Sequence, residues 1–409
     1  MPTKCGLLGQ KLSHSYSPAI HSYLGSYNYE LYEKEPEELE VFLKSGDFTG
    51  INVTIPYKKA VIPYLDSLTT TAQTLGAVNT IVRKDGKLIG HNTDWFGFTA
   101  MVKRSGLDIC GKKVLVLGSG GAASTVIAVL KEMDAMPVVV SRSGEDNYGN
   151  LYRHKDAAMI VNTTPVGMYP QTGSAPVDLA QFPMLEGVLD LIYNPARTKL
   201  LMDASERGLI TENGLLMLVA QAKESAEWFS GQAIADDRIV EIYRKLRAQT
   251  ENIVLIGMPG CGKSTVAARL SAELGRPLVD ADHEIRKAAG CDIMEIFANS
   301  GEYAFRLIET EILEKLGKES GLVIATGGGC VTRAENYPLL HQNGKIFWLQ
   351  RDIKKLPKEG RPLSLTGNLE AMLEVRAPLY RKFADYTVNN DGTPEATVNT
   401  IVRILGESE

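Results

Sequence analysis

The chain has 409 residues, a formal net charge of −5 at pH 7, and ordinary fractions of hydrophobic (44%) and charged (23%) residues. This length predicts two or three domains, each large enough for a hydrophobic core of its own. The negative charge argues against nucleic acid and anionic membranes as partners, so small-molecule substrates are expected.

The cysteines and the hydrophobic pattern indicate the compartment. The five cysteines are scattered without a C-x-x-C pair, which argues against zinc ribbons and disulfide frameworks and suits a reducing environment. The sequence has no signal-peptide h-region and no stretch approaching the ~18 apolar residues that cross a bilayer. A cytoplasmic protein is therefore expected, whereas the pattern predicts no particular oligomeric state.

Apolar runs typical of strands alternate with helix-like periods along the whole chain. The runs lie at residues 114–117, 138–140, 159–161, 253–256, 322–324 and 346–349. This βαβ rhythm predicts an α/β protein with parallel sheets that carry helices on both faces.

The first hundred residues contain polar clusters that an apolar core does not need. Residues 13–18 open a helix in which Ser17, ahead of a proline, is the expected N-cap, and this leaves the Ser15 hydroxyl unexplained. Three further segments place polar groups at a strand end or beside a Gly-rich turn: Asn-Val-Thr-Ile-Pro-Tyr-Lys at 52–58, Gly-Ala-Val-Asn-Thr at 76–80 and Asn-Thr-Asp at 92–94. Taken singly, Lys58 would be a solvated lysine and Asp94 a helix cap.

A Gly-rich turn follows the apolar run at residues 114–117 and precedes a helical run. It fits the dinucleotide-binding pattern G-x-G-x-x-A, and the residues expected to contact the cofactor are Gly118, Gly120, Gly121 and Ala122. An NAD site would have an acidic residue at the end of the next strand. This chain instead has Ser141, Arg142 and Ser143, which suit a 2′-phosphate. NADP is therefore favoured over NAD, with a surface arginine that caps the strand as the alternative.

A domain boundary is expected at residues 244–252. A polar helix ends at residues 244–247 and gives way to Ala-Gln-Thr-Glu-Asn, after which a new apolar run begins. This connection is too short for a flexible tether.

Residues 257–264 fit the phosphate-binding pattern G-x-x-x-x-G-K-[ST] between the apolar run at 253–256 and a helical segment at 265–274. Strand, loop and helix in this order surround an anion with backbone N–H groups and a helix N-terminus. Lys263 is expected to reach the outer phosphates and the Ser264 hydroxyl to face Mg²⁺. The residues expected to contact the nucleotide are Gly257, Gly260, Gly262, Lys263, Ser264 and Thr265. The alternative is a Gly-rich turn without a ligand.

Further candidates follow in the C-terminal part. Asp280 and Asp282 end a strand, where one carboxylate is suited to hold Mg²⁺ through water and the other to accept a proton, although both would also serve as helix caps. Arg306 and Glu309 share a helix face as an i, i+3 pair. The remaining candidates are Gly327, Gly328 and Gly329, which permit close approach of a ring, Arg361 in a polar stretch expected to act as a lid, and Arg376 on a helix.

The N-terminal motifs resemble the shikimate dehydrogenase family over roughly residues 5–245. Two more motifs of that family are present, Asn-Thr-Thr-Pro-x-Gly-Met at 162–168 and Gly-x-x-Met-Leu-Val-x-Gln-Ala at 214–222. The resemblance implies NADPH-dependent reduction of 3-dehydroshikimate to shikimate, with Lys58 and Asp94 as the proton-transfer pair. It implies substrate contacts from Ser15, Ser17, Thr54, Asn79, Tyr193 and Gln221, and Met217 beside the nicotinamide. Tyr193 and Met217 would alternatively be core residues.

Three features depart from the family pattern. His91 stands where an aspartate commonly precedes Asn-Thr-Asp, and Tyr57 replaces the usual Phe or His before the lysine. Only about twenty residues separate Arg142 from Asn162, so the nucleotide-binding lobe is expected to lack a helix and a strand.

The C-terminal motifs resemble shikimate kinase over about residues 252–405. The resemblance implies transfer of the γ-phosphoryl group of ATP to the 3-hydroxyl of shikimate. Asp282 would orient or deprotonate that hydroxyl, and Asp280 with Ser264 would hold the hydration shell of Mg²⁺. Arg306 and Arg376 would clamp the substrate carboxylate, because a guanidinium meets a carboxylate at two points.

Other residues of this part have supporting roles. In the resemblance, Glu309 would fix Arg306, and Arg361 would neutralise charge on the transferring phosphoryl group. Cys261 and Cys330 lie beside the nucleotide and substrate loops, which predicts that thiol reagents inhibit this part.

The combined expectation is one chain that joins a shikimate dehydrogenase to a shikimate kinase, because the product of the first is the acceptor of the second. A two-lobed dehydrogenase would have a shikimate-binding lobe (1–95 plus 214–248) and a Rossmann-like NADP lobe (96–213). A P-loop kinase domain of the nucleoside-monophosphate-kinase type, with a parallel sheet, would follow at 252–409.

Two alternatives stay open. One is a quinate/shikimate dehydrogenase joined to a kinase for another small polyol; Arg142 argues against its looser cofactor choice, and the paired Arg306 and Arg376 argue against a substrate without a carboxylate. The other is a shikimate-binding sensor with one inactive half, which would not need proton-transfer residues such as Lys58 and Asp282.

Overall fold

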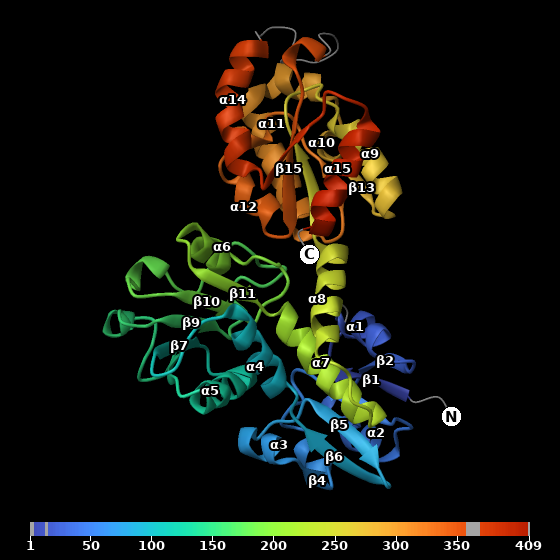
Figure 1. Ribbon diagram of the computed structural model, residues 1–409, viewed down its shortest axis with the longest axis vertical. Coiled ribbons are helices and arrows are strands. Elements are labelled where there is room, and N and C mark those ends of the chain that lie inside the picture. Colours follow the sequence, from blue (N-terminus) through green and yellow to red (C-terminus); the bar gives the residue numbers. More distant parts are fainter. Residues whose placement is uncertain (1–3, 13–14, 357–368, 408–409) are drawn as a thin grey trace. The chain divides into compact units, whose positions relative to one another are not determined.

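The computed structural model of the chain describes residues 4–12, 15–356 and 369–407 (Figure 1). The chain falls into two compact units. Unit 1 contains residues 1–167, 174–193 and 203–246, and unit 2 contains residues 168–173, 194–202 and 247–409. Within the described ranges, no helix is both long enough and apolar enough to cross a membrane.

The first sheet of unit 1 has six strands in the order β2-β1-β3-β5-β6-β4. They are β1 (Lys4–Gly9), β2 (Asn28–Glu33), β3 (Gly50–Val53), β4 (Ser67–Leu68), β5 (Thr80–Lys84) and β6 (Lys87–His91). Strands β1, β2 and β3 are parallel, but β5 runs antiparallel to both β3 and β6. The expectation of parallel sheets throughout is therefore wrong for this sheet.

A two-residue turn, Asp85-Gly86, explains the antiparallel pair. It joins β5 directly to β6, and the φ angles of its residues are 52° and 76°. A type I′ hairpin turn needs positive φ at both central residues, and Asp-Gly is a preferred pair there. The signal for this hairpin is thus present in the sequence.

Helices surround the first sheet and begin close to the polar segments. They are α1 (Ser17–Leu24), α2 (Leu39–Ser45), α3 (Thr70–Leu75), α7 (Leu215–Ser230) and α8 (Asp237–Thr250), with the 3-10 turns η1 (Pro36–Glu38) and η2 (Ile62–Tyr64). Ser17 is the first residue of α1 and Tyr16 is the N-cap, so the predicted N-cap role of Ser17 is wrong. The Ser15 hydroxyl accepts the Ser17 N–H at 3.2 Å and so satisfies one of the free N–H groups of the first turn.

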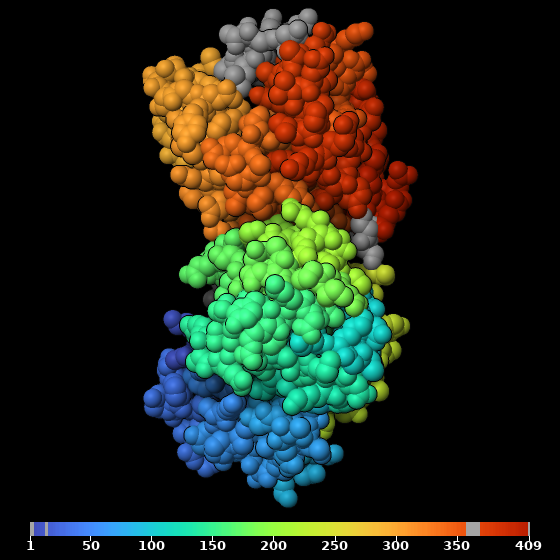
Figure 2. All heavy atoms as spheres, turned by 90° about the vertical axis from the view of Figure 1, so that its left-hand side faces the viewer, coloured from blue at the N-terminus to red at the C-terminus, as the bar shows by residue number. Residues whose placement is uncertain are grey.

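The second sheet of unit 1 has five parallel strands in the order β11-β10-β9-β7-β8. Its strands are β7 (Lys113–Leu117), β8 (Met136–Val140), β9 (Met159–Asn162), β10 (Gly187–Asp190) and β11 (Ile210–Asn213), and they confirm the runs predicted at 114–117, 138–140 and 159–161. The associated helices are α4 (Asp94–Ser105), α5 (Gly121–Glu132) and α6 (Lys199–Glu206), with the 3-10 turn η4 (Leu179–Gln181). Their side chains form a continuous turquoise-to-green surface in the space-filling view (Figure 2).

The connection from β8 to β9 is short. It contains only the 3-10 helix η3 (Leu151–His154). This confirms that a helix is absent from the crossover, as the short spacing between Arg142 and Asn162 predicted.

Unit 2 contains a five-stranded, fully parallel sheet in the order β13-β14-β12-β15-β16. Its strands are β12 (Asn252–Ile256), β13 (Leu278–Asp280), β14 (Val323–Ala325), β15 (Gly344–Gln350) and β16 (Tyr386–Asn389). The helices, which lie on both faces (Figure 1), are α9 (Lys263–Leu274), α10 (Ala281–Ala289), α11 (Ile293–Lys318), α12 (Asn336–His341), α14 (Leu369–Phe383) and α15 (Pro394–Glu407), with the 3-10 turns η5 (Cys330–Thr332) and η6 (Ile353–Lys355). Every residue of β12 is buried, as expected of a central parallel strand covered on both sides. This confirms the predicted parallel sheet.

The expected boundary at residues 244–252 is helical. Helix α8 continues to Thr250, and only Glu251 separates it from β12. No glycine or proline occurs between residues 244 and 252, so the sequence contains nothing that ends the helix earlier.

Candidate active sites

The first candidate site is a cavity of about 510 Å³ in unit 1. It lies where the segment after β3, the start of α4 and one face of α7 meet. The sequence-predicted residues that line it are Ser15, Ser17, Thr54, Lys58, Asn79, Asp94, Ala122, Tyr193, Met217 and Gln221. The structure therefore brings together all eight residues that were predicted to bind the substrate or transfer the proton in this half of the chain.

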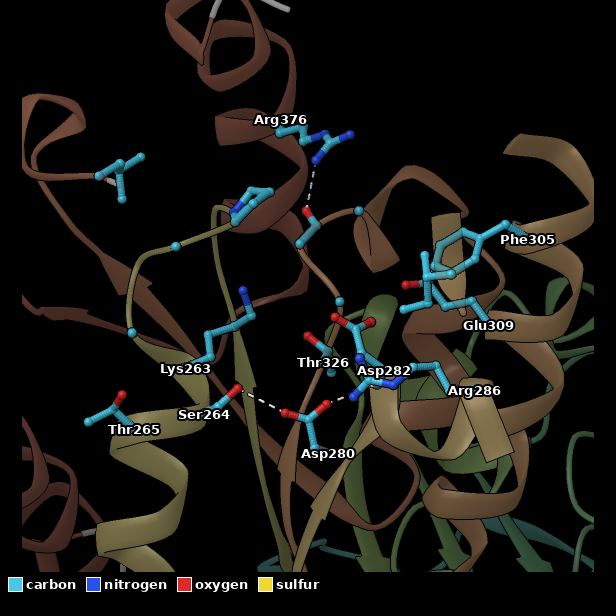
Figure 3. Close-up of a pocket in the computed structure, with 18 of the residues that line it drawn as sticks. Lys263, Ser264, Thr265, Asp280, Asp282, Arg286, Phe305, Glu309, Thr326 and Arg376 are labelled. Carbon is cyan, nitrogen blue, oxygen red and sulfur yellow. Dashed lines mark hydrogen bonds between the residues drawn. The ribbon is translucent and has the colours of Figure 1, made fainter. Parts of the chain in front are cut away.

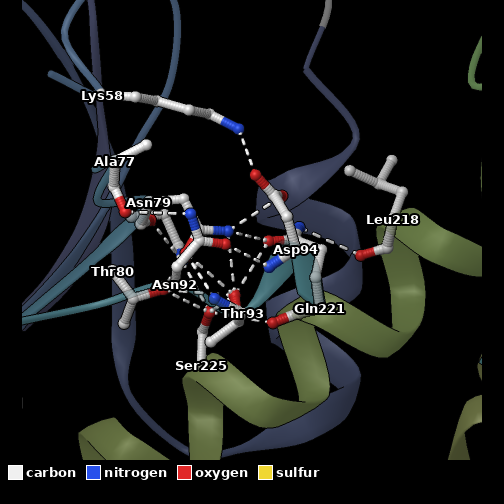
Figure 4. A network of polar contacts seen from close by, with 11 residues as sticks. Lys58, Ala77, Asn79, Thr80, Asn92, Thr93, Asp94, Leu218, Gln221 and Ser225 are labelled. Carbon is white, nitrogen blue, oxygen red and sulfur yellow. Dashed lines mark hydrogen bonds and ion pairs between the residues drawn. The ribbon is translucent and has the colours of Figure 1, made fainter. Parts of the chain in front are cut away.

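Lys58 and Asp94 form an ion pair at this cavity (Figure 4). The Lys58 Nζ atom lies 2.5 Å from Asp94 Oδ2, and their side chains are 24% and 11% exposed. Asp94 is the first residue of α4, where the positive end of the helix dipole favours a carboxylate. The pair thus presents an ammonium whose direction is fixed by a buried, well-supported anion.

Asn79 holds the other carboxylate oxygen of Asp94. Its Nδ2 atom donates to Asp94 Oδ1 at 2.9 Å and lies 3.2 Å from Gln221 Oε1. Its Oδ1 atom accepts the Thr93 N–H at 2.7 Å. Because both ends of this buried amide are engaged, Asn79 orients the Asp94 carboxylate as well as lining the cavity.

A deeper part of this network was not predicted. The Ser225 hydroxyl accepts from Asn52 Nδ2 at 2.7 Å and lies 2.9 Å from Thr80 Oγ1 and 3.0 Å from Thr93 Oγ1. The Tyr29 hydroxyl donates to Asn52 Oδ1 at 2.7 Å. The available signal was the i, i+4 spacing of Gln221 and Ser225, which places both on one face of α7.

For Tyr193 and Met217 the structure supports the core interpretation, whereas contact with substrate and with the nicotinamide stays a prediction. The Tyr193 ring packs against Tyr16 with centroids 5.3 Å apart, and burial raises the pKa of its hydroxyl. Met217 is 8% exposed and belongs to a core cluster. Both side chains nevertheless line the cavity, so each is a core residue that also shapes the site.

The turn predicted to bind a dinucleotide needs its first glycine. Gly118 has φ 106°, and a Cβ there would lie 2.8 Å from Thr163 Oγ1. Gly120 is the N-cap of α5 and Gly121 is its first residue. The N-terminus of α5 is therefore open to an approaching phosphate, which fits a dinucleotide cofactor.

The residues expected at the 2′-phosphate lie at the end of β8. Arg142 and Ser143 are exposed and Ser141 is partly buried, and none of them lines the 510 Å³ cavity. Arg142 forms no ion pair in the part of the chain that the structure describes. Separation from the substrate cavity suits the adenosine end of a dinucleotide, and an uncommitted guanidinium suits a phosphate.

His91, the departure from the family pattern, has structural partners. Its Nδ1 atom lies 2.7 Å from Thr69 Oγ1 and its Nε2 atom 3.8 Å from Glu224 Oε1. Its ring contacts Trp228 with centroids 4.6 Å apart. The nearby His91 imidazole lowers the pKa of Glu224 although burial opposes this. His91 therefore ties the end of β6 to α7.

The second candidate site is a cavity of about 920 Å³ in unit 2 (Figure 3). The sequence-predicted residues that line it are Gly260, Gly262, Lys263, Ser264, Thr265, Asp280, Asp282, Arg306, Glu309, Gly327, Gly328, Gly329 and Arg376. Gly257 lies behind the loop, where its carbonyl accepts from Lys263. Arg361 falls outside the described residues.

The loop between β12 and α9 curves through glycines with positive φ. These are Gly257 (144°), Gly260 (82°) and Gly262 (100°), a geometry open only to glycine. The Lys263 ammonium folds over the loop and donates to the carbonyls of Gly257 (2.9 Å) and Met258 (3.1 Å). The loop and the N-terminus of α9 together form an anion-binding concavity.

Asp280 has two functions at once. Its Oδ2 atom accepts from the Ser264 hydroxyl at 2.8 Å, and its Oδ1 atom accepts the N–H groups of Asp282 and His283 as the N-cap of α10. The cap alternative is therefore correct for Asp280 without removing it from the site. A hydroxyl and a carboxylate held together suit a hard cation such as Mg²⁺, although the described residues contain no cluster of three or more His, Cys, Asp or Glu able to hold a metal.

Arg306 and Glu309 form a buried pair beside the Gly-rich loop. Their atoms Nη1 and Oε2 lie 2.7 Å apart, and Glu309 is fully buried. Burial raises the pKa of Glu309, and the Arg306 guanidinium opposes that shift. A Cβ at Gly329 would lie 2.0 Å from Arg306 Nη2, and one at Gly327 would lie 2.6 Å from Glu309 Oε1. These glycines make room for the pair, whereas the sequence predicted only that they admit a ring.

Arg376 reaches the same loop from α14. Its Nη1 atom donates to the carbonyl of Gly328 at 3.1 Å, and the Tyr380 hydroxyl donates to that same carbonyl. The Nε atom of Arg306 and the Oε1 atom of Glu309 are buried without a hydrogen-bond partner in the described part of the chain. The site therefore keeps unused capacity for a polar ligand.

The expected thiol sensitivity of this part is wrong. Cys261 and Cys330 are both fully buried, and burial raises the pKa of Cys330 to about 12. Reagents attack thiolates at accessible positions, and neither of these two sulfur atoms is accessible.

Comparisons with known proteins match both parts of the chain. A family model described as shikimate dehydrogenase substrate binding domain matches residues 7–81, and one described as shikimate kinase matches residues 259–406. A shikimate dehydrogenase (NADP(+)) from Clostridium perfringens (strain SM101 / Type A) is 39% identical over 266 residues, which are 60% of this chain and 98% of that protein.

Two solved structures resemble the same part of the chain. The chorismate mutase/shikimate 5-dehydrogenase fusion protein from Clostridium acetobutylicum has 36% identity and a TM-score of 0.58, and the match covers 60% of this chain and 97% of that one. Shikimate 5-dehydrogenase from Thermus thermophilus, in complex with NADP(H) and shikimate, has 30% identity and a TM-score of 0.54, with 59% and 99% covered.

Proposed function

Because the chain belongs to the shikimate dehydrogenase family and carries a shikimate kinase domain, we infer that it is a bifunctional enzyme of the shikimate pathway, an oxidoreductase and a phosphotransferase. We propose that the cavity of unit 1 reduces 3-dehydroshikimate to shikimate with NADPH, and that the cavity of unit 2 phosphorylates the shikimate so formed with ATP. One observation carries the proposal: each cavity contains the acid–base group that its reaction needs, beside groups suited to the same carboxylated ring.

In the reductase site, Lys58 is proposed as the proton donor. Hydride supplied by NADPH leaves negative charge on the substrate oxygen, and a positioned ammonium both stabilises that charge and gives up a proton. Asp94, 2.5 Å from the Lys58 ammonium, holds it in place. Ser15, Ser17, Thr54, Tyr193 and Gln221 are proposed to bind the ring hydroxyls and carboxylate.

The cofactor of this site is NADP(H) by family membership. We propose that Gly118 and the N-terminus of α5 receive the pyrophosphate and that Arg142, between Ser141 and Ser143, receives the 2′-phosphate. The unpaired state of Arg142 among the described residues supports this assignment.

In the kinase site, Asp282 is proposed to orient the substrate hydroxyl and accept its proton. The cavity lining includes Asp282 together with Lys263 and the P-loop, so a hydroxyl and a γ-phosphate have room to meet there. Ser264 and Asp280, 2.8 Å apart, are proposed to hold Mg²⁺, which neutralises phosphate charge when bound. Arg306 and Arg376 are proposed to bind the carboxylate of shikimate, and Arg361 to assist the transfer.

The domain assignment is also a proposal. It assigns the shikimate-binding lobe to residues 1–95 plus 214–248, the NADP lobe to 96–213 and the kinase domain to 252–409. The separate sheets β1–β6, β7–β11 and β12–β16 support this division. We further propose that the enzyme is cytoplasmic, because its five cysteines all remain unpaired and its reactions use NADPH and ATP.

A two-stage assay tests the function. The chain is mixed with 3-dehydroshikimate and NADPH, loss of NADPH absorbance is followed to completion, and ATP with MgCl₂ is then added while ADP is measured. We expect both stages to proceed, and the second to require the first unless shikimate is supplied. NADH and quinate in parallel reactions test the alternative dehydrogenase; equal rates with these compounds would contradict the NADPH and shikimate assignments.

A further inference from the structure

Arg351 has no role in the function proposed above. It directly follows β15, the strand that pairs with the P-loop strand β12. Its side chain lines the 920 Å³ cavity together with the P-loop residues Gly262, Lys263 and Ser264. Because β15 pairs with the P-loop strand β12, the Arg351 guanidinium lies close to the P-loop.

The guanidinium lies against the point where the P-loop becomes helix α9. Arg351 Nη1 would be 3.7 Å from a Cβ built on Gly262, which is the N-cap of α9. Across the loop, Asn390 donates to the carbonyl of Cys261 at 2.5 Å and holds the loop in place. The guanidinium thus lies at the helix N-terminus, where backbone N–H groups already favour an anion.

Arg351 also differs from Arg306, Arg376 and Lys355 of this cavity in having no acceptor among the described residues. Arg306 is paired with Glu309, Arg376 donates to the Gly328 carbonyl, and Lys355 lies 3.7 Å from Asp391. Arg351 forms neither a hydrogen bond nor an ion pair with the residues that the structure describes, and its Nε atom is shielded from solvent without a partner. A shielded guanidinium N–H without an acceptor costs free energy that an anionic ligand would recover.

We propose that Arg351 is a phosphate-binding residue of the nucleotide site. Its guanidinium donates to phosphoryl oxygens of the bound nucleoside triphosphate beside the P-loop N–H groups. The planar fork of arginine matches two phosphate oxygens, which a lysine at this position would not do. This inference rests on the proposed kinase function and adds a cation that the fold holds in place independently of Arg361.

The test compares R351Q and R351K with the unaltered full-length chain. The matched control is R269Q, because Arg269 is a half-exposed arginine of α9 that pairs with Glu395 and does not line the cavity. Dissociation constants for ATP and ADP with MgCl₂ are measured by calorimetry, and kinase kcat and KM are measured with ATP and with GTP. Dehydrogenase activity and thermal unfolding of each variant report whether the chain is folded.

For R351Q we expect ATP and ADP to bind about tenfold more weakly or worse, the loss of a charge-assisted hydrogen bond. KM for the nucleotide rises, KM for shikimate stays within about twofold, and the ATP/GTP preference is unchanged because the contact is to phosphate. R351K keeps the charge but not the fork and shows a smaller loss, while R269Q binds as the unaltered chain does.

Two results would overturn the proposal. One is unchanged ATP and ADP affinity in both R351Q and R351K. The other is a loss confined to ATP over GTP, which would place Arg351 against the base instead. Nucleotide binding is measured without shikimate turnover. A chain that binds ATP but fails to phosphorylate shikimate would therefore contradict the proposed function, while the effect of Arg351 on ATP and ADP affinity could still be measured.

Discussion

The two cavities differ in whether their polar side chains already have hydrogen-bond or ion-pair partners. In unit 1 the polar side chains satisfy one another: Lys58 pairs with Asp94, and the Asp94 carboxylate is held by Asn79 within a buried network of amides and hydroxyls. In unit 2 several polar atoms have no partner among the described residues, including the Nε atoms of Arg306 and Arg351. A site that moves one proton on a small ring needs rigid positioning, whereas a site for a polyanion needs spare donors.

The largest expected effect is on dehydrogenase activity, when the Lys58 ammonium is removed from the unit 1 cavity. Lys58→Ala leaves Asp94 without its cation and removes the proposed proton donor, so dehydrogenase kcat should fall about 10²–10⁴-fold. Kinase activity of the same preparation is the internal control and should be unchanged.

The reciprocal variant Asp282→Ala should lose kinase activity and keep dehydrogenase activity. Survival of both activities in either variant would refute these roles.

Adding a side-chain atom beside Arg306 in the unit 2 cavity is expected to have the next largest effect. Gly329→Ala places a Cβ 2.0 Å from Arg306 Nη2, so the guanidinium must move away from its place beside the Gly-rich loop. We expect KM for shikimate to rise about tenfold, the loss of one charge-assisted contact, with little change in KM for ATP. Gly392→Ala, where an added Cβ meets no atom within 4 Å, is the matched control. An unchanged KM for shikimate in Gly329→Ala would show that Arg306 does not bind this substrate.

Cutting the buried network of unit 1 should cost stability more than catalysis. Ser225→Ala removes the shortest of three hydrogen bonds from Asn52 Nδ2, because Thr80 Oγ1 (3.1 Å) and the Asn79 carbonyl (3.4 Å) remain as acceptors. The loss of this hydrogen bond should cost about 0.5–1.5 kcal/mol. Thermal unfolding should therefore begin at a lower temperature, with a modest fall in dehydrogenase kcat. Ser230→Ala changes an exposed serine of the same helix and should alter stability by less than about 0.5 kcal/mol. Equal stability of the two variants would mean that the network adds nothing.

The smallest expected effect is on the acid side of the stability profile. The His91 imidazole, 3.8 Å from Glu224, lowers the pKa of that carboxyl below its ordinary 4.5, so the ionised carboxylate stabilises the fold above that pH. This contribution is lost as pH falls through the lowered pKa of the folded state. In Glu224→Gln, the free energy of unfolding should therefore decrease less steeply below about pH 4.5 than in the unaltered chain. Denaturant unfolding at a series of pH values measures this. A profile identical to that of the unaltered chain would contradict the role of the pair.

Much of this arrangement was predictable because the motifs lie at strand ends. The P-loop, the strand ending at Asp280 and the dinucleotide turn each follow an apolar run, and the carboxyl ends of parallel strands meet at one edge of a sheet. The hairpin of β5 and β6 was also encoded, in Asp85-Gly86, but the overall βαβ rhythm outweighed that local signal.

The partners of buried polar groups were not predictable. Ser225 lies 173 residues from Asn52 in the sequence, so no local pattern joins them. Arg351 occurs in a run of charged residues that resembles a solvated loop, and only the pairing of β15 with β12 shows that it faces the P-loop. For the same reason, the glycines at 327–329 were interpreted through their backbone freedom, while their neighbours Arg306 and Glu309 explain two of them.

The resting position of Lys263 has a consequence for which anions this enzyme retains. Two of its three ammonium N–H groups already donate to the carbonyls of Gly257 and Met258, so a phosphate that accepts more than the third N–H must displace an internal acceptor. A lone orthophosphate or sulfate offers little in exchange, whereas a triphosphate compensates by engaging the loop, the helix terminus and the cavity wall together. We therefore expect the loop to bind long polyphosphate chains more tightly than small anions.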